Sequence, residues 1–186
     1  MSMLPSACQV SGMRDRFRAQ VRDDVKRVAL EQLAASGAAG LSINAIAKEL
    51  GVSGPALYRY FAGRDELLTE LIVDAYDDLA DALAGSGDLD ALARAYRGWA
   101  LEQPHRYRLL YGPPLPGYDA HAERLVHAAQ RSMVILQEHV PDFEEAVLDW
   151  SRLHGFVSLE IGGNFASIGL DADALFERVL RPRSSG

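Results

Sequence analysis

The sequence has 186 residues, of which 48% are hydrophobic and 24% are charged, a composition typical of a globular protein with a sizeable core. Its single cysteine, Cys8, excludes an intrachain disulfide and a cysteine-based zinc site. No apolar run reaches the about 18 residues that a membrane helix needs, and the N-terminus lacks the basic start and apolar block of a secretory signal. We therefore expect a cytoplasmic protein with no membrane partner.

The net charge of −7 is unevenly distributed along the chain. Residues 1–62 carry eight Lys and Arg against five Asp and Glu, whereas residues 63–186 carry 11 against 21. A basic end on an acidic body can direct one face of a molecule to DNA and keep the rest away from it. Because acidic surfaces also occur for solubility alone, the asymmetry suggests a nucleic-acid partner but does not require one.

The first part of the chain predicts a tail followed by four helices. Residues 1–13 have no periodic pattern and are expected to be disordered. Apolar residues at helical spacing predict a helix over 14–36, ended by Gly37, and another long helix over 64–83. Between these two, residues 41–61 indicate a pair of short helices joined by a tight turn.

The second part predicts five further helices, over 88–103, 105–111, 119–139 and 142–167, and a last one ending at residue 180. Asp88 and Asp142 are candidate N-caps for two of them. Residues 182–186 are expected to be a disordered tail. The fold class is all-α with about nine helices, divided into a three-helix domain over 14–62 and a larger helical domain over 63–181.

Residues 41–61, LSINAIAKELGVSGPALYRYF, meet the requirements of a helix-turn-helix. Gly51 lies at the turn, where the chain needs a positive φ, and Ala47 is small where the two helices cross. Ser42 can cap the first helix. The expected apolar contacts come from Ile46, Leu50, Val52, Leu57 and Tyr60.

The motif formed by Ser42, Ile46-Ala47, Gly51-Val52-Ser53, Leu57-Tyr58, Tyr60-Phe61 and Glu66-Leu67 resembles the DNA-binding region of the TetR (tetracycline repressor) family of bacterial regulators. The resemblance covers roughly residues 20–75. It implies a homodimeric transcriptional repressor whose partners are a pseudo-palindromic double-stranded DNA operator and a small-molecule inducer. It further implies that the larger helical domain binds this ligand and forms the dimer.

A recognition helix presents its N-terminal residues to base edges in the major groove. Arg59 is the one long basic side chain of this helix and can hold a guanine or a phosphate, and Tyr58 can donate to a phosphate. The predicted DNA contacts are Arg18, Arg22, Ser42, Asn44, Lys48, Ser53, Gly54, Pro55, Ala56, Tyr58, Arg59, Tyr60 and Arg64. The alternatives are a solvated surface charge for Arg18, Arg22 or Lys48, and core packing for Tyr60. Gly54 departs from the many relatives that carry a basic residue there.

Aromatic side chains gather in the larger domain and predict either a cavity for a small apolar or aromatic ligand or a filled core. The candidate pocket residues are Tyr96, Trp99, Tyr107, Tyr111, His127, Trp150 and His154. The sequence WSRLHG, with Trp150, His154 and Gly155, resembles the Trp-His-Gly subtype of C-terminal domain within the TetR family. His154 is also compatible with a buried, hydrogen-bonded core position.

Apolar residues around Gly162-Gly163 and on the last helix predict a close helix–helix contact. The candidate dimer interface consists of Val157, Ile161, Gly162, Phe165, Ile168, Leu175, Phe176 and Val179. Two such helices from each subunit would form a four-helix contact. Packing inside one subunit is the alternative.

The residues favour a regulator over an enzyme. The five histidines have no i, i+4 metal spacing, and the chain has neither a Gly-rich phosphate loop nor a G-x-S-x-G elbow. No catalytic residue, metal site or cofactor is therefore predicted. A ligand-independent DNA-binding protein and an activator remain alternatives to a ligand-released repressor.

Overall fold

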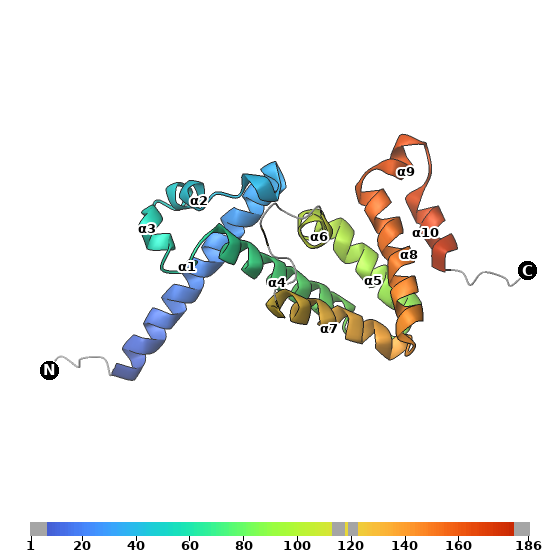
Figure 1. The fold of residues 1–186 in the computed structure, drawn as a ribbon, viewed down its shortest axis with the longest axis horizontal. Coiled ribbons are helices and arrows are strands. Elements are labelled where there is room, and N and C mark those ends of the chain that lie inside the picture. The colour runs from blue at the N-terminus through green and yellow to red at the C-terminus, as the bar shows by residue number, and fades with distance from the viewer. Residues whose placement is uncertain (1–6, 113–117, 119–122, 181–186) are drawn as a thin grey trace, which may run out of the picture. The chain divides into compact units, whose positions relative to one another are not determined.

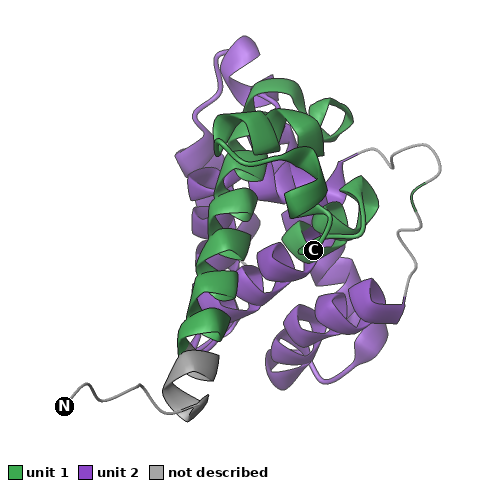
Figure 2. Cartoon of the chain, turned by 90° about the vertical axis from the view of Figure 1, so that its left-hand side faces the viewer, with its two compact units in different colours: residues 1–71, 113–118 green, residues 72–112, 119–186 purple. Residues whose placement is uncertain are grey.

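The computed structural model describes the backbone of residues 7–112, 118 and 123–180, and the side chains of these residues from Met13 onward (Figure 1). Within them the chain has ten α-helices, one 3₁₀ helix and no strand, which confirms the all-α prediction. The chain divides into two compact units (Figure 2). Unit 1 comprises residues 1–71 and 113–118, and unit 2 comprises residues 72–112 and 119–186. The division falls inside a helix, whereas the sequence placed it at residues 62–63.

Unit 1 contains α1 (Ala7–Ser36), η1 (Ala38–Gly40), α2 (Ile43–Glu49), α3 (Gly54–Leu57) and the first part of α4 (Arg64–Leu83). The first helix begins at Ala7, ahead of the predicted start at Arg14; residues 1–6 of the predicted tail lie outside the described residues. Its end at Ser36 and both bounds of α4 match the prediction. The core of the unit is formed by Val25, Val28, Ala29, Leu33, Ile46, Leu57, Phe61, Leu67 and Leu68.

The turn between α2 and α3 depends on Gly51, which has a φ of 67°. The Gly51 N–H donates to the Lys48 carbonyl at 3.2 Å, and the Val52 N–H donates to the Ala47 carbonyl at 2.9 Å. A side chain at a positive φ is strained, so the glycine fits the predicted role. The Val52 side chain is 42% exposed, and its predicted apolar contact is wrong because the turn directs it to solvent.

Unit 2 contains the second part of α4 and helices α5 (Leu89–Glu102), α6 (Pro104–Tyr111), α7 (Glu123–His139), α8 (Phe143–Ile161), α9 (Asn164–Ser167) and α10 (Ala172–Leu180). Asp88 and Asp142 cap α5 and α8 as predicted: their carboxylates accept from the Ala91 and Glu145 N–H groups at 2.7 and 2.9 Å. Residues 119–122, predicted to begin a helix, and 182–186, predicted to be a tail, lie outside the described residues.

The prediction of one helix over 142–167 is wrong, because the chain breaks at Gly162-Gly163. Gly163 has a φ of 74°, which ends α8 and allows the short α9 to start in a new direction. The buried core of the unit lies among α4, α5, α6, α7, α8 and α10 and includes Leu79, Leu92, Trp99, Leu136, Leu153, Phe156, Val157 and Phe176.

Candidate nucleic-acid interface and aromatic cluster

The helix-turn-helix exposes one side of α3 and the turn that follows it. Leu57 and Phe61 are each 1% exposed and anchor this segment in the core of unit 1, which agrees with the apolar contact predicted for Leu57. Ser53, Pro55, Tyr58 and Arg59 are exposed, and Gly54, Ala56 and Tyr60 are half-buried. The exposed side of this segment can therefore reach a ligand without unpacking the unit.

Gly54 lies against Asn44 of α2. A Cβ added at Gly54 would approach the Asn44 Oδ1 to 3.1 Å, which is closer than ordinary van der Waals contact. A long basic side chain at this position would have to displace the Asn44 amide. This close approach is a physical reason for the departure from the basic residue that many relatives carry.

The two serines that precede α2 and α3 differ in their contacts. The Ser42 Oγ accepts from the Ala45 N–H at 3.3 Å, and the Ser42 N–H donates to the Gln32 Oε1 at 3.0 Å, so Ser42 caps α2 as predicted. Ser53 occupies the N-cap position of α3 without a capping bond from its side chain. The exposed Ser53 hydroxyl is thus available to an external partner, as is the exposed Lys48 ammonium on α2.

Arg22 and Arg64 are engaged inside unit 1. The Arg22 guanidinium donates to the Tyr60 carbonyl at 2.7 Å, pairs with the Glu70 carboxylate at 2.9 Å and lies 4.5 Å above the Phe61 ring centroid. Arg64 donates to the Ala38 carbonyl at 2.7 Å. These contacts use groups that a phosphate would need. Sequence reasoning missed them because the acceptors lie far along the chain.

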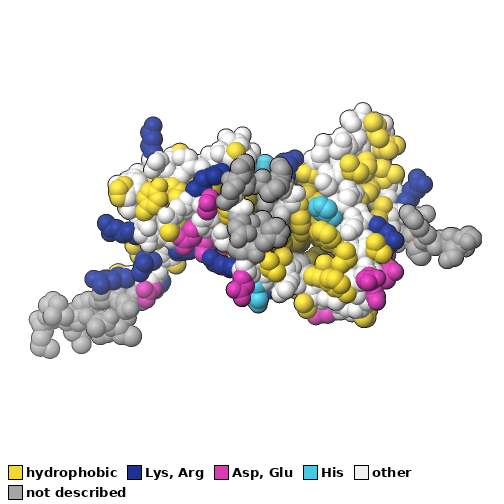
Figure 3. Space-filling model, in the orientation of Figure 1, with side chains coloured by type: hydrophobic (Ala, Val, Ile, Leu, Met, Phe, Trp, Pro, Cys, Tyr) yellow, Lys and Arg dark blue, Asp and Glu magenta, His cyan; other side chains and the backbone are white. Residues whose placement is uncertain are grey.

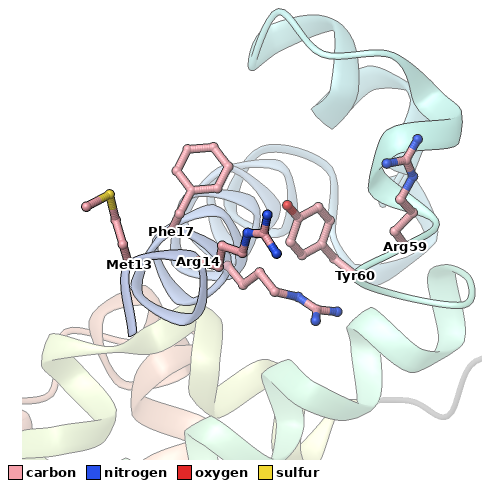
Figure 4. Close-up of a pocket in the computed structure, with 6 residues that line it drawn as sticks. Met13, Arg14, Phe17, Arg59 and Tyr60 are labelled. Carbon is pink, nitrogen blue, oxygen red and sulfur yellow. The ribbon is translucent and has the colours of Figure 1, made fainter. Parts of the chain in front are cut away.

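Arg18 borders a surface hollow of about 590 Å³ together with Met13, Arg14, Phe17, Arg59 and Tyr60. In Figure 4, Arg14 extends from α1 toward Tyr60, whose hydroxyl end points back toward α1, and Arg59 lies beyond Tyr60. Figure 3 shows that Lys and Arg side chains stand out from the surface of unit 1 over α1, α2 and α3. The sequence did not lead us to name Met13 or Phe17 as contacts, although the i, i+4 spacings of Met13 to Phe17 and of Arg14 to Arg18 were an available signal.

In unit 2, five of the seven predicted pocket residues form one aromatic cluster, in which His154 lies at the centre. The imidazole stacks on Trp150 and Tyr107 with centroid distances of 5.2 and 5.7 Å, and the Tyr111 ring lies 4.7 Å away. Tyr96 meets Tyr107 edge-on at 6.3 Å. The rings contact one another, which is how a filled core packs.

Hydroxyl groups complete the surroundings of this histidine. The His154 Nδ1 lies 3.0 Å from the Tyr107 hydroxyl and 3.3 Å from the Tyr96 hydroxyl. Burial lowers the pKa of the His154 imidazole below its ordinary value, because the charged form would lose water. Burial also raises the pKa of the Tyr96, Tyr107 and Tyr111 phenols, so all three keep their protons at neutral pH.

Trp99 and His127 are not in ring contact with these five side chains among the described residues. The Trp99 indole N–H donates to the Asp78 carboxylate at 2.9 Å, and Arg106 donates to the same oxygen at 2.8 Å. His127 is exposed on α7. The structure thus places these two residues outside the cluster.

The residues of the predicted dimer interface differ in exposure. Val157 and Phe176 are 0% and 1% exposed, and the Phe176 ring lies 5.4 Å from that of Phe156. These two residues belong to the core of their own subunit, which corrects their placement in an interface. Ile161, Phe165 and Leu175 are half-buried, whereas Gly162, Ile168 and Val179 are exposed.

The described residues offer neither a metal site nor a membrane span. They hold no cluster of three or more His, Cys, Asp or Glu side chains arranged to bind a metal ion. None of the described helices combines the length and apolar character that crossing a lipid bilayer requires.

A small helical head with an exposed helix-turn-helix, followed by a larger all-helical unit, defines a helix-turn-helix transcriptional regulator. Two family models agree with this class. "Bacterial regulatory proteins, tetR family" matches residues 27–71, and "Tetracyclin repressor-like, C-terminal domain" matches residues 89–182. The chain belongs to the TetR family of bacterial transcriptional regulators. Neither description mentions a Trp-His-Gly subtype.

Individual relatives support the assignment. The chain is 46% identical over 134 residues to the HTH-type transcriptional regulator Rv1816 of Mycobacterium tuberculosis, covering 67% of this chain but only 57% of that protein. It is 34% identical to Rv0681 of the same species, over 86% of this chain and 78% of the relative. The crystal structure of regulatory protein SCO4313 superposes with a TM-score of 0.81 at 42% identity, covering 89% of this chain and 96% of that one. The family and these relatives are regulators, not enzymes.

Proposed function

We propose that this chain is a ligand-responsive repressor, which binds a pseudo-palindromic DNA operator as a homodimer in the cytoplasm and is released by a small-molecule inducer. The observation that carries the proposal is the exposed segment from Ser53 to Arg59, held in place by the buried Leu57 and Phe61. Exposed polar and basic side chains on a rigid helix-turn-helix are what reading a DNA groove requires.

In this proposal the exposed residues divide into base-reading and phosphate-binding groups. Arg59 donates to a guanine or a phosphate, and Tyr58, which is 50% exposed, donates to a phosphate. Pro55 and Ala56 contact thymine methyl groups. Ser42, Lys48 and Ser53 donate to the DNA backbone, while Asn44 and Gly54 set the spacing of α2 and α3. Arg22 and Arg64 stabilise unit 1 through their internal contacts.

The aromatic cluster of unit 2 is the proposed ligand site, for a small apolar or aromatic molecule. Its Trp150 and His154 fit the Trp-His-Gly subtype that the sequence suggested. An entering ligand would replace ring-to-ring contacts with ring-to-ligand contacts and would find His154 Nδ1 and two phenol hydroxyls as its polar partners. A DNA-binding regulator with no ligand is the second candidate, because the rings of this cluster already contact one another.

The proposed mechanism uses α4 as the lever between the units. Within unit 1, the Thr69 hydroxyl on α4 lies 2.9 Å from the Tyr118 hydroxyl. A ligand that shifts α4 would move the two recognition segments of the dimer out of register with successive grooves and lower the affinity for DNA. Since coupling is reciprocal, DNA must weaken inducer binding by the same factor.

Selection from a random duplex pool at two salt concentrations tests the DNA reading. We expect enrichment of a two-fold symmetric site, lost in the Arg59→Ala, Tyr58→Phe double variant. The matched control is Arg27→Ala, which removes a cation from α1 that pairs with Glu31. Absence of enrichment, or enrichment indifferent to Arg59 and Tyr58, would contradict the proposal. Thermal shifts against an apolar and aromatic compound library, repeated with Trp150→Ala, separate a ligand-responsive regulator from the second candidate.

A further inference from the structure

The N-terminal part of α1 extends beyond the packed core of unit 1. Residues 13–20 are all exposed, and Val25 is the first buried residue after them. A helical segment as short as residues 13–20 is only marginally stable in water by itself, because most of the stability of a helix comes from the packing of one face. An exposed extension of this kind gains stability when a partner covers it.

Two side-chain stripes run along this extension. Arg14 and Arg18 are one helical turn apart and share a face, and Met13 and Phe17 form a parallel apolar stripe beside them. Met13 is 64% exposed and Phe17 is 66% exposed, which places them among the most exposed large apolar side chains that the structure describes. The extension thus presents cations and apolar groups side by side.

The arginines around the hollow differ from seven other arginines among the described residues. Within the described residues no carboxylate pairs with Arg14, Arg18 or Arg59, whereas a further set of arginines each pair with one. That set is Arg22, Arg27, Arg94, Arg97, Arg106, Arg131 and Arg152. Three cations at one hollow, with no carboxylate partner in the described part of the chain, create a local positive field that favours an anion.

The position of the hollow identifies the anion. Arg59 and Tyr60 directly follow α3, so one wall of the hollow continues the proposed recognition segment and the other is the α1 extension (Figure 4). We propose that the hollow binds the sugar–phosphate backbone of the same DNA duplex, with phosphates held by Arg14 and Arg18 and deoxyribose covered by Met13 and Phe17. This inference rests on the proposed DNA-binding function and adds a contact that lies outside residues 27–71, the region matched by the family model.

The chemistry favours DNA backbone over a free small anion. A volume of about 590 Å³ exceeds what one phosphate group fills, and the apolar side chains on its rim suit a sugar better than water. Guanidinium groups bind phosphate oxygens in a bidentate manner. Such contacts position the duplex and do not read its sequence.

The test compares two double variants that remove the same charge from α1. The first is Arg14→Ala, Arg18→Ala; the control is Arg16→Ala, Arg27→Ala, whose two positions share a face that lies about 200° away around the helix axis. Alanine preserves helix propensity at these exposed positions. Binding of full-length protein to its selected duplex and to a scrambled duplex of equal length is measured at several salt concentrations.

We expect the Arg14→Ala, Arg18→Ala variant to bind both duplexes more weakly than the wild type, by the same factor for each. The preference for the selected site should be kept. The slope of log K against log salt should fall by about 2 for each bound subunit, because each phosphate contact contributes about 0.9. The control variant should match the wild-type slope. A Met13→Ser, Phe17→Ser variant should bind both duplexes more weakly, while its slope of log K against log salt stays that of the wild type.

Other results overturn the proposal in distinguishable ways. If the slope of log K against log salt is the same for the Arg14→Ala, Arg18→Ala variant as for the control, the hollow binds no DNA backbone. If the variant loses its preference for the selected site, the hollow contributes to base reading. A change of oligomeric state without DNA, measured by light scattering, makes the hollow a protein interface. If the wild type itself binds no duplex, or Arg59→Ala and Tyr58→Phe have no effect, the proposed function fails before the hollow is tested.

Discussion

Arg22 joins three parts of unit 1 through a single side chain. It donates to the Tyr60 carbonyl, pairs with the partly buried Glu70 carboxylate and covers the Phe61 ring. Removing it leaves the Tyr60 carbonyl without this donor and takes one of two cations from the Glu70 carboxylate, which still pairs with Lys26 at 3.2 Å. We therefore predict that Arg22→Ala lowers the free energy of unfolding by on the order of 1 to 3 kcal/mol, as measured by urea denaturation.

Arg27→Ala is the control for this prediction, since Arg27 also pairs with a carboxylate on α1 but the pair is exposed, at 57% and 56%. Exposed pairs contribute little to stability. Equal stability losses in the two variants would contradict the structural role of Arg22. If Arg22→Ala instead keeps the stability of the wild type but binds DNA more weakly, Arg22 is one of the phosphate contacts predicted from the sequence.

His154 gives the stability of unit 2 a dependence on pH. Because burial lowers the pKa of the imidazole in the folded state, the unfolded chain binds the proton at higher pH than the folded one. The contribution of His154 to stability is then fully present above the ordinary histidine pKa of about 6.5 and is lost as pH falls through that value toward the lower folded pKa.

The measurement is urea denaturation at several pH values for the wild type and for His154→Gln, which keeps a polar group but cannot titrate. We predict that the wild type loses stability relative to the variant as the pH falls below about 6.5. His105→Gln, at an exposed position on α6, is the control and should follow the wild-type curve. Parallel curves for the wild type and His154→Gln would contradict the prediction.

At the scale of elements, Arg97 of α5 holds α8 and α10 together. Its guanidinium donates to Glu160 at 2.8 and 2.6 Å and to Asp173 at 2.6 Å, and it lies 4.7 Å above the Phe176 ring. Arg97 and Glu160 are only 14% and 11% exposed. We predict that Arg97→Met lowers the free energy of unfolding by on the order of 2 to 3 kcal/mol and increases amide exchange in α10.

The matched control is one helical turn away. Arg94 of α5 also pairs with α10, through Glu177, but this pair is half-exposed. Arg94→Met should leave both the stability and the amide exchange of α10 close to those of the wild type. If the two variants lose the same stability and show the same amide exchange in α10, burial does not decide the strength of these ion pairs.

The helices themselves were largely predictable because their signals are local. The period of apolar residues and the capping residues Asp88 and Asp142 fixed most bounds within a residue or two. The break at Gly163 was missed, since a glycine inside an apolar helix pattern is equally compatible with a close helix contact. Periodicity also indicates which face of a helix is apolar but does not identify what covers it. Val157 and Phe176 were therefore assigned to a partner when they pack inside their own chain.

The candidate site was predictable to a different degree in each unit. The recognition segment follows from residues adjacent in sequence, so Tyr58 and Arg59 could be named in advance and are exposed. The internal role of Arg22 depends on Glu70, which only the fold brings near. The centre of the aromatic cluster could be named from residue type, but Trp99 and His127 could not be separated from it without the three-dimensional packing.

At the scale of the whole molecule, the proposed dimer needs an exposed apolar face. Leu148 and Leu159 are 48% and 49% exposed, and their spacing of about three helical turns puts them on one face of α8. Gly155 lies on the same face between them and permits close approach of a second helix. On α10, Val179 is 43% exposed. Unlike the buried Val157 and Phe176, these residues are exposed, and we propose that they contact the partner subunit.

We predict that Leu159→Asp converts the dimer to a monomer, because the interface would have to bury an unpaired carboxylate. Light scattering coupled to gel filtration measures the mass, and binding to a full and a half operator measures the consequence. Affinity for the full site should fall on the order of a hundredfold or more, since the second recognition segment is no longer tethered, while half-site affinity stays unchanged. The control, Val134→Asp, changes a 56% exposed residue of α7. If Val134→Asp is a monomer and Leu159→Asp is a dimer, the interface lies on α7 and not on α8. If Leu159→Asp is a monomer and its affinity for the full site is unchanged, the two recognition segments do not act together.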